Sequence, residues 1–195
     1  MDKIKDFWNK VVRFFKQLLD LFKRPEESLA QLKNNKVPEK VFFKKVILPF
    51  IAVCSVFAAL NVVLYGSPTV ASVCVKMLFT FIAFVAAFFI STTVCQKTLE
   101  LCYNQKTDKS TIYQVVGVGF LVIYLLSLLL SIVNMFFLWI LSFYVVYLLW
   151  IIADVVFGIE ENNRGKFLFF NSISIIFSEA LIYKILTLLV PNLSL

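Results

Sequence analysis

Apolar residues dominate the chain after residue 45 in five long runs, which short polar stretches separate. Each run holds about 20 residues, and at ~1.5 Å per helical residue that length matches the ~30 Å hydrocarbon core of a bilayer. Lipid cannot satisfy backbone N–H and C=O groups, so only helices fit such runs between hydrophilic loops. The pattern predicts an all-α, polytopic membrane protein with five transmembrane helices, over residues 46–65, 72–94, 111–130, 135–157 and 167–189.

Two features shape the ends of these predicted spans. Pro49 lies near the start of the first span, where its missing N–H removes one backbone hydrogen bond and is expected to kink the helix. The apolar signal hardly drops between the third and fourth spans, so residues 131–134 must form a tight turn. Residues 46–195 are predicted to form one membrane domain, preceded by a basic extension over residues 1–45.

The extension has the pattern of an amphipathic helix. Over residues 4–24, apolar residues recur at steps of three and four, and basic residues occupy other angles. A charge near the bilayer centre costs ~2.5–3.5 kcal/mol, so this helix is predicted to lie in the membrane interface instead of spanning it. The alternative is that its apolar stripe packs on the inner ends of the spans. The residues expected at the lipid surface are Lys3, Trp8, Lys10, Arg13, Lys16, Lys23 and Arg24.

A second short helix is predicted to follow directly. Pro25 ends the first helix and suits the first position of the next, because its missing N–H would be unpaired there anyway. Glu26 and Glu27 then fall in the first turn, where the helix dipole favours anions. Asn34 and Asn35 are expected to terminate this helix.

Composition and charge agree with a membrane protein and orient it. The chain is 61% apolar and 16% charged, whereas soluble domains average roughly 45–50% and 25%. Net charge is +7, and twelve of the 19 basic residues lie in the first 45 positions. Because basic residues stay on the cytoplasmic side, the amino terminus is predicted inside and the carboxyl terminus outside. Anionic lipids of the cytoplasmic leaflet, and not nucleic acid, are the predicted partners.

Catalysis and metal binding have few residues to build on. The chain has no His, which removes the commonest general base and metal ligand. Cys54 and Cys74 fall in apolar runs, while Cys95 and Cys102 are predicted in a cytoplasmic loop, and no pair has zinc-site spacing. The glycines do not cluster as a phosphate-binding loop requires. We therefore predict no enzyme activity, no cofactor and no metal site.

Ionisable residues inside the spans are the main functional candidates, because they are costly there. Glu179 lies deepest, near the middle of the fifth predicted span, beside a polar face of Asn171, Ser174 and Ser178. One interpretation is a proton or cation site, or the wall of a small polar pathway. The other is interhelical hydrogen bonding, worth ~0.6–2 kcal/mol per contact. Lys76 and Lys184 are the candidate partners of Glu179, although Lys184, five residues on, points away from it.

Asp154 lies near the inner end of the fourth predicted span. It is expected to meet water, Lys97 or Lys166 in a solvated or surface ion pair.

Small residues on two spans predict close contact between helices, because they let helix backbones approach. They are Ala83, Ala87, Ser91, Gly117 and Gly119.

Four stretches carry a resemblance to a known family. They are residues 22–27 (FKRPEE) after the basic leader, 46–50 (VILPF) opening the first span, 144–150 in the fourth, and the polar loop 160–166. In layout and in these stretches the chain resembles the Yip family of five-span membrane proteins, first known as partners of Rab-type GTPases, and its bacterial branch in particular. The resemblance implies a five-helix bundle, no catalysis, a role in membrane organisation or trafficking, and location in a bacterial inner membrane.

Three functions follow as hypotheses. The first is a non-enzymatic membrane protein of the Yip type that organises or scaffolds membranes. The second is a small transporter or ion or proton pathway that uses Glu179. The third is an accessory subunit of a membrane complex, in which the small-residue faces bind other membrane proteins or a second copy of the chain.

Overall fold

The computed structural model describes residues 23–34, 37–65, 69–133 and 136–189. The amphipathic helix predicted over residues 4–24 falls almost entirely outside these ranges, and so do Lys3, Trp8, Lys10, Arg13 and Lys16. The elements in chain order are α2 (Pro25–Asn34), α3 (Glu39–Phe42), the π-helical turn η1 (Phe43–Ile47), α4 (Leu48–Tyr65), α5 (Val70–Tyr103), α6 (Lys109–Val133), the 3-10 helix η2 (Phe136–Phe143), α7 (Tyr144–Val155), the 3-10 turn η3 (Glu161–Asn163) and α8 (Arg164–Leu189).

The predicted fold class is confirmed. In the described part of the chain all regular structure is helical, and five helical segments are long and apolar enough to cross a membrane. They comprise Glu39–Leu64, Val70–Tyr103, Lys109–Val133, Phe137–Val155 and Glu161–Leu189. The chain is therefore a polytopic helical membrane protein.

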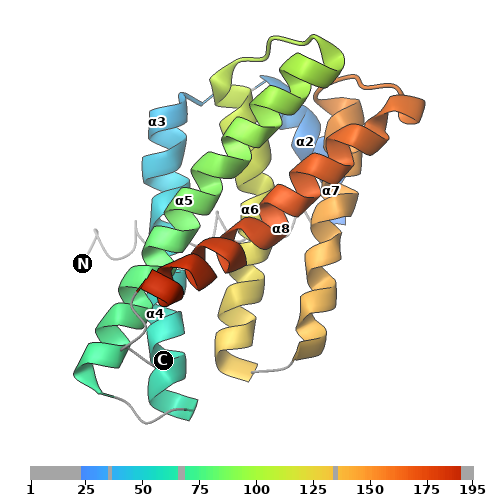
Figure 1. Ribbon diagram of the computed structural model, residues 1–195. Helices are drawn as coiled ribbons and strands as arrows, with labels where there is room; N and C mark the ends of the chain where they lie inside the picture. The colour runs from blue at the N-terminus through green and yellow to red at the C-terminus, as the bar shows by residue number, and fades with distance from the viewer. Residues whose placement is uncertain (1–22, 35–36, 66–68, 134–135, 190–195) are drawn as a thin grey trace, which may run out of the picture.

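Helix α6 forms the centre of the bundle (Figure 1). Every residue from 114 to 124 is buried, so α6 is covered on all sides, as a core helix must be. Helices α4, α5, α7 and α8 all contact it, and the most extensive contact in the bundle is between α5 and α8. Helix α2 packs on the outside of α7, where it inserts Leu29, which is fully buried.

The second span is longer than the sequence pattern predicts. Helix α5 continues past residue 94 to Tyr103 and ends at Asn104, whose left-handed backbone (φ 51°) terminates it. Lys97, Cys95 and Cys102 therefore lie on a helix, and their predicted placement in a loop is wrong. The last turns remain helical because Lys97 and Gln96 both bond the carboxylate of Glu100 within the helix.

The first span stays helical through Pro49, but the helix has a π-helical turn just before this proline. Directly before it lies the π-helical turn η1, in which the N–H of Leu48 bonds the carbonyl of Phe43, five residues back. A wider turn of this kind accommodates the proline where the regular ladder loses its donor. The fourth span also starts irregularly, since η2 precedes α7 and eight residues are unusually many for a 3-10 helix.

The small residues do mark close helix contacts. Ala83, Ala87 and Ser91 are buried, and the Ser91 hydroxyl lies 2.8 Å from that of Ser174 on α8. A Cβ on Gly119 would lie 2.9 Å from Cδ1 of Ile175, and one on Gly117 would lie 2.5 Å from Cε1 of Phe42. Both glycines are therefore needed for neighbouring side chains to reach the α6 backbone.

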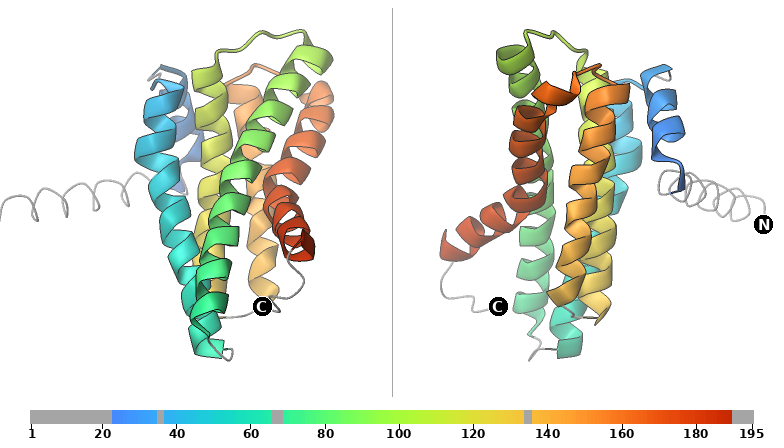
Figure 2. Two further views of the ribbon diagram at one scale, coloured as in Figure 1. Left: turned by 60° about the vertical axis from the view of Figure 1, so that its left-hand side comes forward. Right: turned by 90° about the vertical axis from the view of Figure 1, so that its right-hand side faces the viewer.

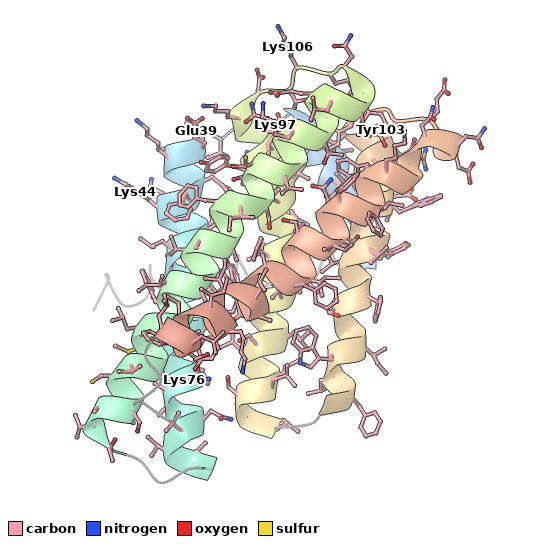
Figure 3. All side chains as sticks on the ribbon, viewed as in Figure 1. Glu39, Lys44, Lys76, Lys97, Tyr103 and Lys106 are labelled. Carbon is pink, nitrogen blue, oxygen red and sulfur yellow. The ribbon has the colours of Figure 1, made fainter. Side chains whose placement is uncertain are left out.

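Charged side chains gather at one end of the bundle. Lys44, Lys97 and Lys106 lie at the end that carries the connection from α5 to α6, whereas Lys76 lies towards the other end (Figure 3). Helix α8 runs obliquely across the bundle, and its C-terminal half leans away from the other helices (Figure 2, right). Glu179 and Tyr183, in this half of α8, line a cavity.

Candidate functional site

A partly open cavity of about 240 Å³ lies in the half of the bundle opposite the basic end. Five elements build it: the end of α4, the start of α5, the end of α6, the start of η2 and the C-terminal half of α8. Phe84 and Trp139 supply aromatic walls. Its polar lining is made by Asn61, Lys76, Thr80, Ser127, Ser131, Glu179 and Tyr183.

Lys76 is held against α8 by Tyr183. Its ammonium nitrogen donates to the Tyr183 hydroxyl at 2.8 Å and lies 4.2 Å from the centroid of the same ring. The hydrogen bond and the cation–π contact both fix the ammonium at the cavity wall. Tyr183 was not among the residues singled out from the sequence, although it lies one helical turn after Glu179 on the same face.

Glu179 faces the same cavity from α8. Its carboxylate and the Lys76 ammonium line the same cavity, yet no ion pair joins these two groups. Within the described ranges, no hydrogen-bond donor contacts this carboxylate either. One positive and one negative side chain thus line one cavity without closing on each other.

A hydrogen-bonded polar wall connects α4 and α6 across the cavity. The amide nitrogen of Asn61 donates to the carbonyl of Ser131 at 3.1 Å, and the Ser131 hydroxyl donates to the carbonyl of Ser127 at 2.8 Å. These bonds fix the side chains that face Lys76 and Glu179, and they present polar groups to any bound molecule.

The predicted polar face of Asn171, Ser174 and Ser178 lies outside the lining of this cavity. All three residues are buried, and the Ser174 hydroxyl bonds Ser91 on α5. At about 100° per residue, Ser178 and Glu179 point in different directions on α8. Ser174 therefore serves the contact between α5 and α8, while Glu179 lines the cavity.

Three buried oxygens on α8 have no hydrogen-bond partner in the described part of the chain. They are Oδ1 of Asn171, whose amide nitrogen donates to Phe167, and the hydroxyls of Ser172 and Ser178. They continue the polar character of α8 from the cavity towards the basic end.

Lys184 does not belong to the cavity. It is exposed on α8, five residues beyond Glu179 and on another side of the helix. Of the two candidate partners, the structure brings only Lys76 to Glu179.

Asp154 meets a residue that sequence reasoning missed. As expected, the Asp154 side chain is 59% exposed and forms an ion pair, but the partner is Arg164, whose Nη2 lies 2.6 Å from the carboxylate, and not Lys97 or Lys166. Arg164 is only 9% exposed, its Nε donates to the carbonyl of Ile159, and its guanidinium lies over the ring of Trp150. These contacts fasten the turn between α7 and α8, so Arg164 has a structural role.

Of the predicted lipid-surface residues, the structure places Lys23 and Arg24. Both are exposed beside the start of α2, and Arg24 forms an exposed ion pair with Glu27 at 3.4 Å.

Metal ligands do not cluster in the described ranges, where no three Cys, Asp or Glu residues come together. Cys54 and Cys95 are buried, whereas Cys74 and Cys102 are exposed, and all four are free thiols.

Fold and cavity together define a helical membrane protein with five spans and a charged, polar cavity in one half of its bundle. Comparisons with protein-family models, with curated proteins and with solved structures found no match to this chain. The resemblance to the Yip family stays a prediction.

Proposed function

We propose that this protein binds a small polar solute or ion in the cavity around Lys76 and Glu179, as a small transporter or ion pathway. It acts without catalysing a reaction. The observation that carries this proposal is that an ammonium and a carboxylate line one cavity and are not joined by an ion pair.

The energetic argument is that unpaired charges inside a membrane protein are costly. Two opposite charges in a low-dielectric bundle attract each other strongly, so a purely structural pair is expected to close. Here Lys76 turns to Tyr183, and Glu179 stays open to the cavity. Such an arrangement is stable when water or a polar solute fills the space between the charges.

The proposal includes an orientation in a bacterial cytoplasmic membrane. Basic side chains gather at one end of the bundle, which supports a cytoplasmic position for that end and for the amino terminus. The cavity then lies in the outer half of the bilayer, and the carboxyl terminus is outside.

The test is solute exchange by the full chain in proteoliposomes. Vesicles are challenged with gradients of glycine, glycerol or sodium chloride, and light scattering follows their volume. We expect faster exchange of at least one solute than in protein-free vesicles, with loss of that exchange in Glu179→Gln and retention in Lys184→Met. No acceleration, or an unchanged Glu179→Gln, contradicts the proposal.

A second candidate function is membrane organisation of the Yip type, and the charged end of the bundle favours it. Exposed Lys44, Lys97 and Lys106 lie together there, and each basic residue near an anionic leaflet contributes about 1 kcal/mol of attraction. Native mass spectrometry of protein extracted from mixed bilayers tests this function. We expect the retained lipids to be enriched in anionic species. If anionic and neutral lipids are retained equally, this function is contradicted.

A further inference from the structure

We infer that the cavity takes a small zwitterion, a molecule with one ammonium and one anionic group, whose anionic end lies at Lys76 and whose ammonium lies at Glu179. This inference rests on the proposed function and names the ligand class of the same cavity.

The charge balance of the cavity selects this class. Among the described residues that line it, Lys76 and Glu179 are the ionisable ones apart from the phenol of Tyr183, so the charges of one ammonium and one carboxylate sum to zero. A singly charged ligand would neutralise one of them and leave the other uncompensated inside the bundle, which is costly at low dielectric. A zwitterion pairs both, and it enters with no net charge.

The Lys76 side of the cavity is built for an anionic group. An ammonium has three N–H donors, and one of them is used on the Tyr183 hydroxyl. Because that hydroxyl accepts from Lys76, its own hydrogen is available to donate. A carboxylate or phosphate at this position can therefore receive bonds from both side chains.

The Glu179 side of the cavity suits an ammonium group. An ionised carboxylate only accepts hydrogen bonds, and no donor in the described ranges contacts this one. The rings of Phe84 and Trp139 belong to the same cavity, and aromatic faces attract cations.

The volume and position of the cavity limit the ligand further. The cavity volume of about 240 Å³ lies below the roughly 300–1,000 Å³ of typical small-molecule pockets, which favours a small ligand. Because the cavity is partly open, we consider two sources of the ligand. One is a free amino acid from the aqueous phase, and the other is the ethanolamine phosphate headgroup of a lipid.

Binding to the full chain, purified in a non-ionic detergent, tests the inference by calorimetry. The probes are glycerophosphoethanolamine, glycine, ethylamine and acetate, of which the first two are zwitterions without net charge. We expect at least one of the two zwitterions to bind roughly tenfold or more tightly than both singly charged probes, because each charged hydrogen bond contributes strongly. Preference for glycerophosphoethanolamine indicates the lipid headgroup as the source, and preference for glycine indicates a free solute.

Substitutions then assign the two ends. We expect Lys76→Met and Glu179→Gln each to weaken zwitterion binding roughly tenfold to a hundredfold, and Lys184→Met, the matched control on the exposed side of α8, to leave it unchanged. Tyr183→Phe removes a single hydroxyl and tests the anionic end if a charge variant fails to fold. It should weaken acetate and the zwitterions and leave ethylamine unaffected.

The outcomes separate this inference from the function beneath it. If ethylamine or acetate binds as tightly as the zwitterions, the inference of a zwitterionic ligand is wrong, whereas the proposed solute binding in the cavity still stands. The same conclusion follows if none of the four probes binds but the chain still exchanges a solute in vesicles. If the chain neither binds a probe nor exchanges a solute, the proposed function is wrong as well.

Discussion

The ammonium of Lys76 and the hydroxyl of Tyr183 lie 2.8 Å apart although 107 positions separate the two residues in the chain. The bond joins the start of α5 to the end of α8, at the side of the bundle where α8 leans away from its neighbours (Figures 2 and 3). It holds the ammonium at the wall of the cavity that Glu179 also lines.

Tyr183→Phe is expected to destabilise the protein modestly. The substitution removes the hydrogen bond to Lys76 and keeps the ring under the ammonium, so the loss is about 1 kcal/mol. Tyr183→Leu, which also removes the cation–π contact, should cost more. Thermal unfolding in detergent measures both. Equal stability of Tyr183→Leu and the wild type would show that the contact contributes nothing.

Gly119→Leu is expected to disrupt the contact between α6 and α8. A Cβ at this position would lie 2.9 Å from Cδ1 of Ile175, so leucine overpacks the contact and must displace the Ile175 side chain or the helix, at a cost of about 1–3 kcal/mol. Adding Ile175→Ala should restore part of the loss. Gly165→Ala is the matched control, since a Cβ there meets nothing within 4 Å, and it should cause no loss. If both glycine variants unfold at the same temperature, the predicted close approach is contradicted.

Arg164→Met is expected to loosen the turn between α7 and α8. It deprives the carbonyl of Ile159 and the carboxylate of Asp154 of a buried donor, with a cost of about 1–3 kcal/mol. Arg164→Lys should rescue little, because an ammonium cannot reproduce the planar guanidinium fork. The exposed Lys166→Met serves as the control, and unfolding in detergent is the measurement. Full rescue by lysine would show that charge alone matters.

Cys102 offers a test of the proposed orientation. It is exposed on the last turn of α5, at the basic end, and it should react with a membrane-impermeant maleimide only after the cytoplasmic face is opened. The experiment uses a chain in which the other three cysteines are replaced. Val70→Cys, at the opposite end of α5 and 84% exposed, should label in intact cells when Cys102 is replaced as well. The reverse pattern would invert the topology.

The fold was predictable because lipid imposes a strong pattern. Apolar runs of about 20 residues predict the five spans, and the structure has five helical segments that are long and apolar enough to be these spans. The proline and the two glutamates at 25–27 predict the start of α2, which the structure confirms. The end of α5 was not predictable in the same way, because its last turns leave the apolar pattern and persist through side-chain bonds to Glu100. Hydropathy predicts which residues lie in the hydrocarbon core of the membrane, but it does not predict where a helix ends outside that core.

The site was predictable in its residues and not in its geometry. Glu179 and Lys76 stand out because charges are rare within spans, and the structure brings them to one cavity. Which polar residues share that cavity depends on the angle of α8. The regular spacing of Asn171, Ser174 and Ser178 does not reveal that they are buried outside the cavity, or that Ser174 bonds Ser91 on α5. Asn61 and Trp139 come from other helices, so only the packed bundle reveals them.

The accessibility of the cavity to a polar reagent tests the central claim most directly. Ser127→Cys, in the cavity lining, and Ser178→Cys, buried outside it, are introduced one at a time into a chain without native cysteines. A small cationic thiol reagent is then added to the outer face of intact cells. The account predicts rapid reaction at position 127 and little or none at position 178. Equal reactivity at the two positions, or no reaction at position 127, would contradict it.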